Sequence, residues 1–195
     1  MKKNLILIGI IALLLISFLY VKSIYNNMVN YDESVSEKWS QVENVYQRRM
    51  DLIPNLVNTV KGYADFEKQT LTDVINARAK ATSVNINPQN LDANSLQQFQ
   101  AAQGGLTSAL SKLMVVVERY PDLKANQNFL ELQSQLEGTE NRIAVERKKF
   151  NEVIKSYNTY IRSFPKNMFA VMFGFDKKAY FEAEQGAQKA PEVKF

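Results

Sequence analysis

The chain has 195 residues, 46% of them hydrophobic, with 24 Lys and Arg against 20 Asp and Glu, and it contains neither His nor Cys. This length suits a single domain. Without imidazole or thiol groups, the chain cannot form a Ser-His-Asp or Cys-His catalytic triad, a His/Cys zinc site or a disulfide. It also lacks the phosphate-binding loops GxGxxG and GxxxxGK followed by Ser or Thr. The composition therefore argues against an enzyme, a cofactor and a bound metal.

The net charge of +4 is small, and two of the basic residues, Lys2 and Lys3, precede a long apolar segment. The remaining charges are mixed in sign along the chain. This pattern is typical of a solvated helical surface rather than of a face that binds phosphates. We expect no nucleic-acid partner and no small-molecule substrate.

Residues 4–21 are almost entirely apolar and carry no charge. As a helix they would span about 27 Å, close to the roughly 30 Å thickness of a hydrocarbon core. Lys2 and Lys3 flank one end, and Tyr20 and Lys22 lie at the other, where their polar groups can reach the interface. The pattern predicts a single-pass transmembrane anchor in contact with the lipid bilayer.

A cleaved signal peptide is the alternative interpretation of this segment. The apolar stretch is longer than the hydrophobic region of an ordinary signal peptide, and no cleavage site of the small-x-small type follows it. The short N-terminus, residues 1–3, carries more positive charge than the other flank, where Lys22 stands alone. The positive-inside tendency therefore predicts that the N-terminus lies in the cytoplasm and that the bulk of the chain lies outside it.

Beyond the anchor, apolar residues recur at steps of three and four, the period of helical bundles. The stripes comprise Val35, Trp39, Val42 and Tyr46; Ile53, Leu56, Val60 and Tyr63; Leu106, Leu110, Leu113, Val117 and Tyr120; and a long run from Phe129 to Phe164. We predict an all-α protein: a transmembrane helix followed by an antiparallel up-and-down bundle of three to four long helices over residues 22–165.

Helix-breaking residues divide these stripes. Pro54 must kink its helix or start a new one. A polar loop is expected over residues 83–95, and Gly104-Gly105 should interrupt or begin the next helix. The last long helix should open at Ala125 or Asn126 and stop at Phe164-Pro165.

Two charged residues lie at positions that the apolar stripes assign to the core. Arg49 lies on the stripe of its helix, and Glu146 occupies a core position of the last long helix. A cross-helix Arg49–Glu146 ion pair would satisfy both charges and set the register. The alternative is an arginine that binds a lipid head group or a partner's carboxylate. The neighbouring Arg48 and Asp51 are candidates for interaction.

Glu137 and Glu140 place two carboxylates on one helix turn, with Glu146 further along. Di-metal sites in helical bundles need Glu-x-x-His motifs, and this chain has no His. An exposed polar face is the expectation here. A carboxylate-dependent enzyme with these three residues around a divalent ion is the remaining alternative.

The segment 166–184 is apolar and aromatic, and residues 185–195 form a tail. Phe169, Phe173 and Phe175 are interaction candidates in this segment. We expect it to pack over one end of the bundle. Alternatively it lies in the membrane interface or forms an oligomer contact, since exposed apolar patches mark association surfaces. Lys166, Lys177 and Lys178, which are nearby in the sequence, would suit anionic head groups.

Several motifs along the chain resemble the LemA family. They are WSQV at 39–42, RRMDLIPNLV at 48–57, VKGYA at 60–64, ERYPDLKAN at 118–126 and EGTENRIA at 137–144. The resemblance implies a bacterial single-pass membrane protein with an antiparallel helical bundle and no established enzymatic activity or cofactor. It also implies gene neighbourhoods with membrane-associated partners, including a membrane metalloprotease.

We therefore expect a non-enzymatic scaffold or adaptor of the bacterial envelope. It would lie in the inner membrane, associate with copies of itself and contact other envelope proteins. The alternative is an accessory or regulatory partner of a membrane protease or sensor.

Overall fold

The computed structural model describes residues 2–63 and 67–182, and this part of the chain is helical without a β-strand. The long helices are α1 (Lys2–Lys61), α2 (Lys68–Ser83), α3 (Ala93–Val117) and α5 (Gln127–Arg162). The short elements are the 3-10 turn η1 (Pro88–Asn90), α4 (Pro121–Lys124) and α6 (Lys166–Phe173). The prediction of an all-α fold is confirmed. The predicted tail, residues 185–195, lies outside the described residues.

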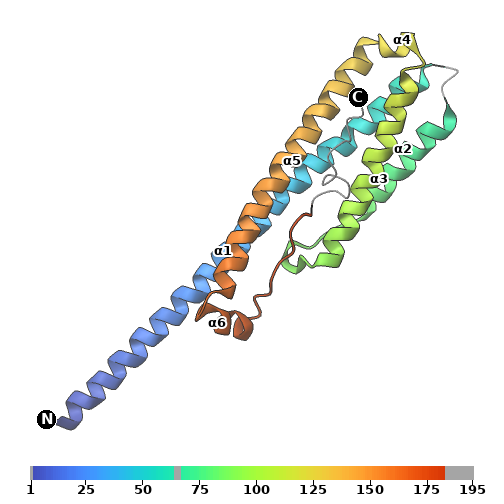
Figure 1. Ribbon diagram of the computed structural model, residues 1–195. Coiled ribbons are helices and arrows are strands. Elements are labelled where there is room, and N and C mark those ends of the chain that lie inside the picture. Colours follow the sequence, from blue (N-terminus) through green and yellow to red (C-terminus); the bar gives the residue numbers. More distant parts are fainter. Residues whose placement is uncertain (1, 64–66, 183–195) are drawn as a thin grey trace, which may run out of the picture.

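The four long helices form an up-and-down bundle (Figure 1). α1 and α5 pack along each other as one antiparallel pair, and α2 and α3 form the other. The first part of α1 projects from the bundle as a single rod. α6 lies at the end of the bundle from which this rod projects. The N-terminal apolar segment and the bundle thus share one continuous helix.

Pro54 lies inside α1, so the alternative in which a new helix starts there is wrong. Proline has no N–H, and its position in the helix leaves the carbonyl of Met50 without its usual i+4 donor. Arg78 of α2 supplies a donor instead, because its Nε lies 2.9 Å from the Met50 carbonyl oxygen. A side chain from a neighbouring helix therefore compensates the interrupted backbone ladder.

Polar side chains cap the two helices that follow the polar loop and the short α4. The carboxylate of Asp92 accepts the Ser95 N–H at 2.8 Å, and this hydrogen bond lowers the pKa of Asp92. Asn126 accepts the Phe129 N–H at 3.1 Å, which starts α5 where the sequence predicted. Since α3 already begins at Ala93, Gly104-Gly105 lies within it, and the predicted interruption is wrong.

Apolar side chains of the bundle form two clusters, one in each half. The cluster next to the projecting part of α1 surrounds Trp39, whose ring centroid lies 5.4 Å from that of Phe99 and 5.6 Å from that of Phe150. The cluster in the distal half includes Ile53, Leu56, Leu106, Leu113 and Phe129. The apolar residues of the predicted stripes thus pack against one another inside the bundle of a single chain.

Candidate functional site: a polar layer in the bundle and an apolar face at its base

A layer of polar side chains separates the two apolar clusters. On α1 the first cluster ends at Tyr46, the second begins at Met50, and Arg49 lies between them. On α3, Gln103 likewise lies between the last residue of one cluster and the first residue of the other. On α5, Thr139 and Glu140 occupy the corresponding position. The helices therefore meet at one polar level in the middle of the core.

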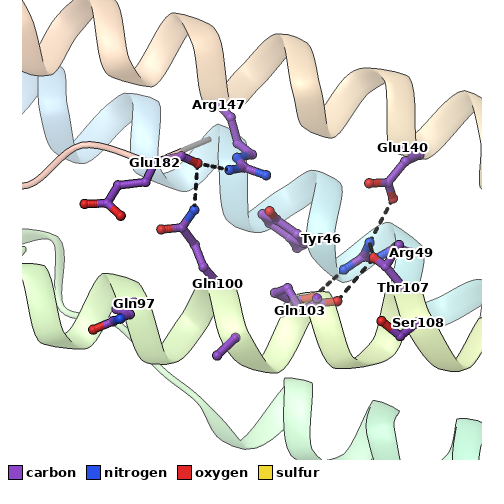
Figure 2. A pocket seen from close by; sticks show the side chains of 12 residues that line it. Tyr46, Arg49, Gln97, Gln100, Gln103, Thr107, Ser108, Glu140, Arg147 and Glu182 are labelled. Carbon is purple, nitrogen blue, oxygen red and sulfur yellow. Dashed lines mark hydrogen bonds and ion pairs between the residues drawn. The ribbon is translucent and has the colours of Figure 1, made fainter. Parts of the chain in front are cut away.

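Arg49 lies at the centre of this polar layer (Figure 2). Its side chain is buried, with 2% exposed. Its guanidinium donates to Glu140 Oε2 at 2.8 Å, to Gln103 Oε1 at 2.6 Å and to Thr107 Oγ1 at 3.1 Å. The guanidinium carbon also lies 5.1 Å from the ring centroid of Tyr46. Such charge-assisted hydrogen bonds offset the cost of burying the cation.

The amide of Gln103 extends the layer to the remaining helix, because its Nε2 donates to the carbonyl of Ala81 in α2 at 3.4 Å. Residues of α1, α2, α3 and α5 are thus linked at one level. A hydrophobic core tolerates small shifts of one helix along another, whereas this set of hydrogen bonds is satisfied in one register only. We conclude that the layer fixes how the four helices align.

The predicted Arg49–Glu146 ion pair is wrong. Arg49 pairs with Glu140, and Glu146 pairs with Lys149 on its own helix at 2.7 Å. Six residues of helix correspond to about 9 Å along the axis, so the two helices align differently from what the stripes suggested. Arg49 is nevertheless buried and forms an ion pair with another helix, with Glu140 as its partner.

A cavity of about 440 Å³ opens beside Arg49, between α1, α3 and α5. Gln97, Gln100, Ser108 and Arg147 lie around it (Figure 2). Among residues 2–63 and 67–182, no three acidic side chains come together as ligands for a metal ion. Glu140, which the sequence offered as a ligand, is instead bonded to Arg49.

The segment that follows α6 is held against α5 by two asparagines. Asn158 accepts the N–H of Lys178 at 3.0 Å and donates to its carbonyl at 2.8 Å. Asn151, two turns earlier, makes the same pair of hydrogen bonds with Phe181, both at 2.9 Å. Each side-chain amide therefore satisfies both the N–H and the carbonyl of one residue, as the backbone of a neighbouring β-strand would. These two residues could not be predicted from the sequence, because asparagines on a helix give no periodic signal.

Lys178 is buried in this segment although the sequence suggested it for lipid head groups. Its ammonium lies 2.6 Å from Asp32 of α1 and donates to the Pro88 carbonyl at 2.9 Å. Tyr157 donates its hydroxyl to the Asp176 carbonyl at 2.9 Å, and burial together with the nearby Asp32 raises the pKa of Tyr157. These contacts fix the segment to the bundle.

The candidate membrane-interface residues Lys2, Lys3, Tyr20 and Lys22 are all exposed on α1. Between them, α1 is long and apolar enough to cross a membrane, and none of its apolar window is buried in the bundle. The bundle core begins at Ile24, which is 3% exposed.

Arg48 and Asp51, the other charged candidates, are exposed on α1, and Asp51 accepts a hydrogen bond from Gln47 at 2.7 Å. Their side chains therefore lie outside the buried polar layer that their neighbour Arg49 organises.

The three candidate phenylalanines lie on the inner side of α6 and its exit. Phe173 and Phe175 place their ring centroids 5.1 and 6.0 Å from that of Tyr25 in α1, and Phe169 packs against the first cluster. Phe173 is itself 36% exposed, and its neighbours are more exposed: Phe164 is 81%, Met168 64%, Val171 86% and Met172 61% exposed. α6 is therefore apolar on both sides, and only one side is covered by the protein.

Comparison with known proteins agrees with this architecture. The LemA family model matches residues 38–195. The chain belongs to the LemA family. Protein LemA of Metamycoplasma hominis is 23% identical over 180 residues, which cover 92% of this chain and 78% of that protein.

Magnetosome proteins are also similar to this LemA family member. MamQ 2 of Paramagnetospirillum magneticum is 28% identical over 175 residues, and MamQ of Magnetospirillum gryphiswaldense is 27% identical over 174. The alignments cover 81% and 80% of this chain but 64% of each MamQ protein, so the chain spans less than two thirds of their length. None of these names is that of an enzyme.

Proposed function

We propose that this LemA family protein is a non-enzymatic scaffold of the bacterial envelope, anchored in the inner membrane by the first part of α1. The observation that carries the proposal is the continuity of α1. Its apolar residues 4–21 are not covered by the bundle, and the bundle core begins at Ile24 of the same helix. A rod of this kind places a bundle at a set distance from a bilayer. The name of the MamQ relatives, which are proteins of the magnetosome, is consistent with a role at a membrane.

Self-association is the second part of the proposal. The stripes that suggested a coiled coil are used inside the bundle, so copies would have to meet through other surfaces. Exposed apolar side chains such as Val145, which is 50% exposed, and Leu130, which is 43% exposed, support such contacts. The anchor segments would bring copies together in the plane of the membrane.

Membrane fractionation of the full-length protein tests the anchor. We expect the protein to resist alkaline extraction from membranes, and a Leu14→Arg/Leu15→Arg variant to be extracted, because each arginine costs about 2.5–3.5 kcal/mol at the centre of a spanning helix. The matched control is Val115→Arg in α3. Release of the unaltered chain by alkali, or removal of its first two dozen residues, contradicts the anchor.

The absence of cysteine makes orientation measurable with single-cysteine variants. A membrane-impermeant maleimide should label Ser134→Cys in the bundle from the periplasmic side and leave Lys3→Cys unlabelled. The reverse pattern places the bundle in the cytoplasm.

Native mass measurement in lipid nanodiscs, combined with crosslinking in cells, tests self-association. Crosslinked copies of the chain support a scaffold that assembles with itself. A strict monomer that is crosslinked only to a protease or sensor favours the alternative of an accessory subunit.

A further inference from the structure

We infer that the outer face of α6 is a second membrane contact, which inserts into the interface of the same bilayer that holds α1. This inference rests on the proposed membrane anchor. The face consists of Met168, Val171 and Met172, with Phe164 just before the helix, all more than 60% exposed. Met168, Val171 and Met172 are spaced three and four residues apart, so they share one side of the helix.

The composition of α6 is unusual for a helix at the surface of a soluble bundle. Such a helix normally carries polar residues on the side away from the core. α6 covers its inner side with contacts between its phenylalanines and α1, yet its outer side is also apolar. A helix with two apolar sides is expected between a protein and a second apolar phase.

The position of α6 along α1 identifies that phase as the bilayer. Phe173 contacts the ring of Tyr25, which follows the end of the apolar segment by four residues. Four helical residues correspond to about 6 Å, and the head-group region of a bilayer is roughly 5–8 Å deep on each side. α6 lies beside α1 where the rod leaves the bundle (Figure 1). This position corresponds to head-group depth when residues 4–21 span the hydrocarbon core.

The charges around α6 favour an anionic lipid surface over a protein partner. Arg162, Lys166 and Lys177 lie close to this face in the sequence, and Lys22 lies on α1 before Tyr25. Lys166 also lies 4.3 Å from the ring centroid of Tyr160. Asp176 is an exposed acidic residue close to α6 in the sequence, whereas a further basic residue, Lys178, is buried and paired with Asp32. Basic residues next to an interfacial apolar face attract anionic head groups.

The turn after α6 keeps its outer face in place. Gly174 has φ +75°, and its N–H returns to the last turn of the helix. The N–H of Phe175 bonds to the Ala170 carbonyl at 2.9 Å, which turns the chain back toward the bundle. At its start, α6 is bonded to the end of α5 through the Asn167 N–H and the Ser163 carbonyl, and beyond the turn Asn158 holds Lys178 against the bundle, so the outer face is a fixed surface.

Depth-dependent fluorescence quenching on full-length single-cysteine variants tests this inference. The protein is reconstituted in vesicles of phosphatidylcholine and phosphatidylglycerol, with and without lipids that carry a quencher near the head group. An environment-sensitive fluorophore is attached at Val171→Cys, at Tyr20→Cys as the anchor control, and at Val115→Cys as the distal control. We expect Val171→Cys to lose emission to a similar extent as Tyr20→Cys, and Val115→Cys to lose none.

The outcomes separate this inference from the proposed anchor. Quenching at Tyr20→Cys without quenching at Val171→Cys overturns the inference and leaves the anchor in place. No quenching at either position overturns both. A blue-shifted but unquenched emission at Val171→Cys assigns the face to a protein contact and overturns the lipid assignment.

A second variant keeps the test independent of the label position. With the fluorophore at Met168→Cys, the additional change Val171→Glu should abolish quenching, because a carboxylate opposes insertion next to anionic lipids. Val115→Glu, which is also an exposed apolar-to-acidic change, should leave it unaltered. Unchanged quenching in the Val171→Glu protein contradicts the inference.

Discussion

Arg49 illustrates how one residue determines the alignment of this bundle. The guanidinium is buried and reaches three partners on two helices, while Glu140, its charged partner, is 49% exposed. The two partners of this ion pair therefore differ in how far they are exposed to solvent. The carboxylate retains much of its hydration, whereas the cation depends on its protein partners.

Replacing Arg49 by leucine should lower the free energy of unfolding by about 3 kcal/mol, because Gln103 and Thr107 lose a buried partner. Glu140→Gln is the matched control and should cost less than about 1 kcal/mol, since a half-exposed amide can still accept the hydrogen bond. Urea denaturation in detergent, followed by circular dichroism, measures both changes. Equal effects would show that the charge of the pair, and not the buried hydrogen bonding, stabilises the layer.

Two glycines should respond in opposite directions to the same substitution. Gly138 lies exposed within α5, and an added methyl group would meet no other heavy atom within 4 Å, so Gly138→Ala should stabilise the protein by about 0.5–1 kcal/mol. Gly174 has φ +75°, and Gly174→Ala should cost about 1–2 kcal/mol locally. The denaturation midpoint reports the first change, and hydrogen exchange of α6 reports the second. A stabilising Gly174→Ala would contradict the left-handed turn.

At the scale of single elements, α1 shows how a proline is tolerated within a long helix. Pro54 removes the donor for the Met50 carbonyl, and Arg78 replaces it from α2. The segment 175–182 uses the same principle, since Asn151 and Asn158 satisfy backbone groups that have no strand beside them. In both places side chains complete the hydrogen bonding of the main chain.

A double-mutant cycle tests the role of Arg78. Arg78→Ala in the unaltered chain should destabilise it by about 1.5–3 kcal/mol, the range for a hydrogen bond to a charged group. In a Pro54→Ala background, the new N–H of residue 54 can bond the Met50 carbonyl, so the cost of Arg78→Ala should fall by at least about 1 kcal/mol. Thermal unfolding of the four proteins measures this coupling. Additive effects would show that Arg78 acts through other contacts.

The sequence allows some of these elements to be predicted and not others. Periodic stripes reveal helices and core positions, including that of Arg49, because burial repeats with the helix turn. The partner of Arg49 was missed because the alignment of antiparallel helices depends on the intervening turns, which carry no such repeat. The roles of Asn151 and Asn158 could not be predicted either, because a polar residue on a helix gives no periodic signal that points to a backbone partner. In α6, both sides are apolar, so the pattern alone cannot distinguish the phenylalanines that face α1 from the exposed residues beside them.

At the scale of the whole molecule, the distance between the anchor and the bundle is short. The apolar segment ends at Val21, and the core begins at Ile24 without a break in α1. A flexible linker would allow the bundle to move away from the bilayer, whereas a continuous helix holds it at one height. The position of α6 relative to the lipid should therefore depend on the length of α1.

Inserting seven helix-forming residues between Lys22 and Ser23 tests this dependence. Seven residues raise the bundle by about 10 Å and return almost to the original rotation, because they complete nearly two turns. Quenching by head-group labels should then disappear at Val171→Cys and persist at Tyr20→Cys. The thermal midpoint should stay unchanged, because the insertion lies outside the core. The same seven residues added after Phe195 serve as the control and should leave quenching at both positions intact. If Val171→Cys is quenched equally in the lengthened protein, the bundle reaches the bilayer by tilting, and α1 does not act as a rigid spacer.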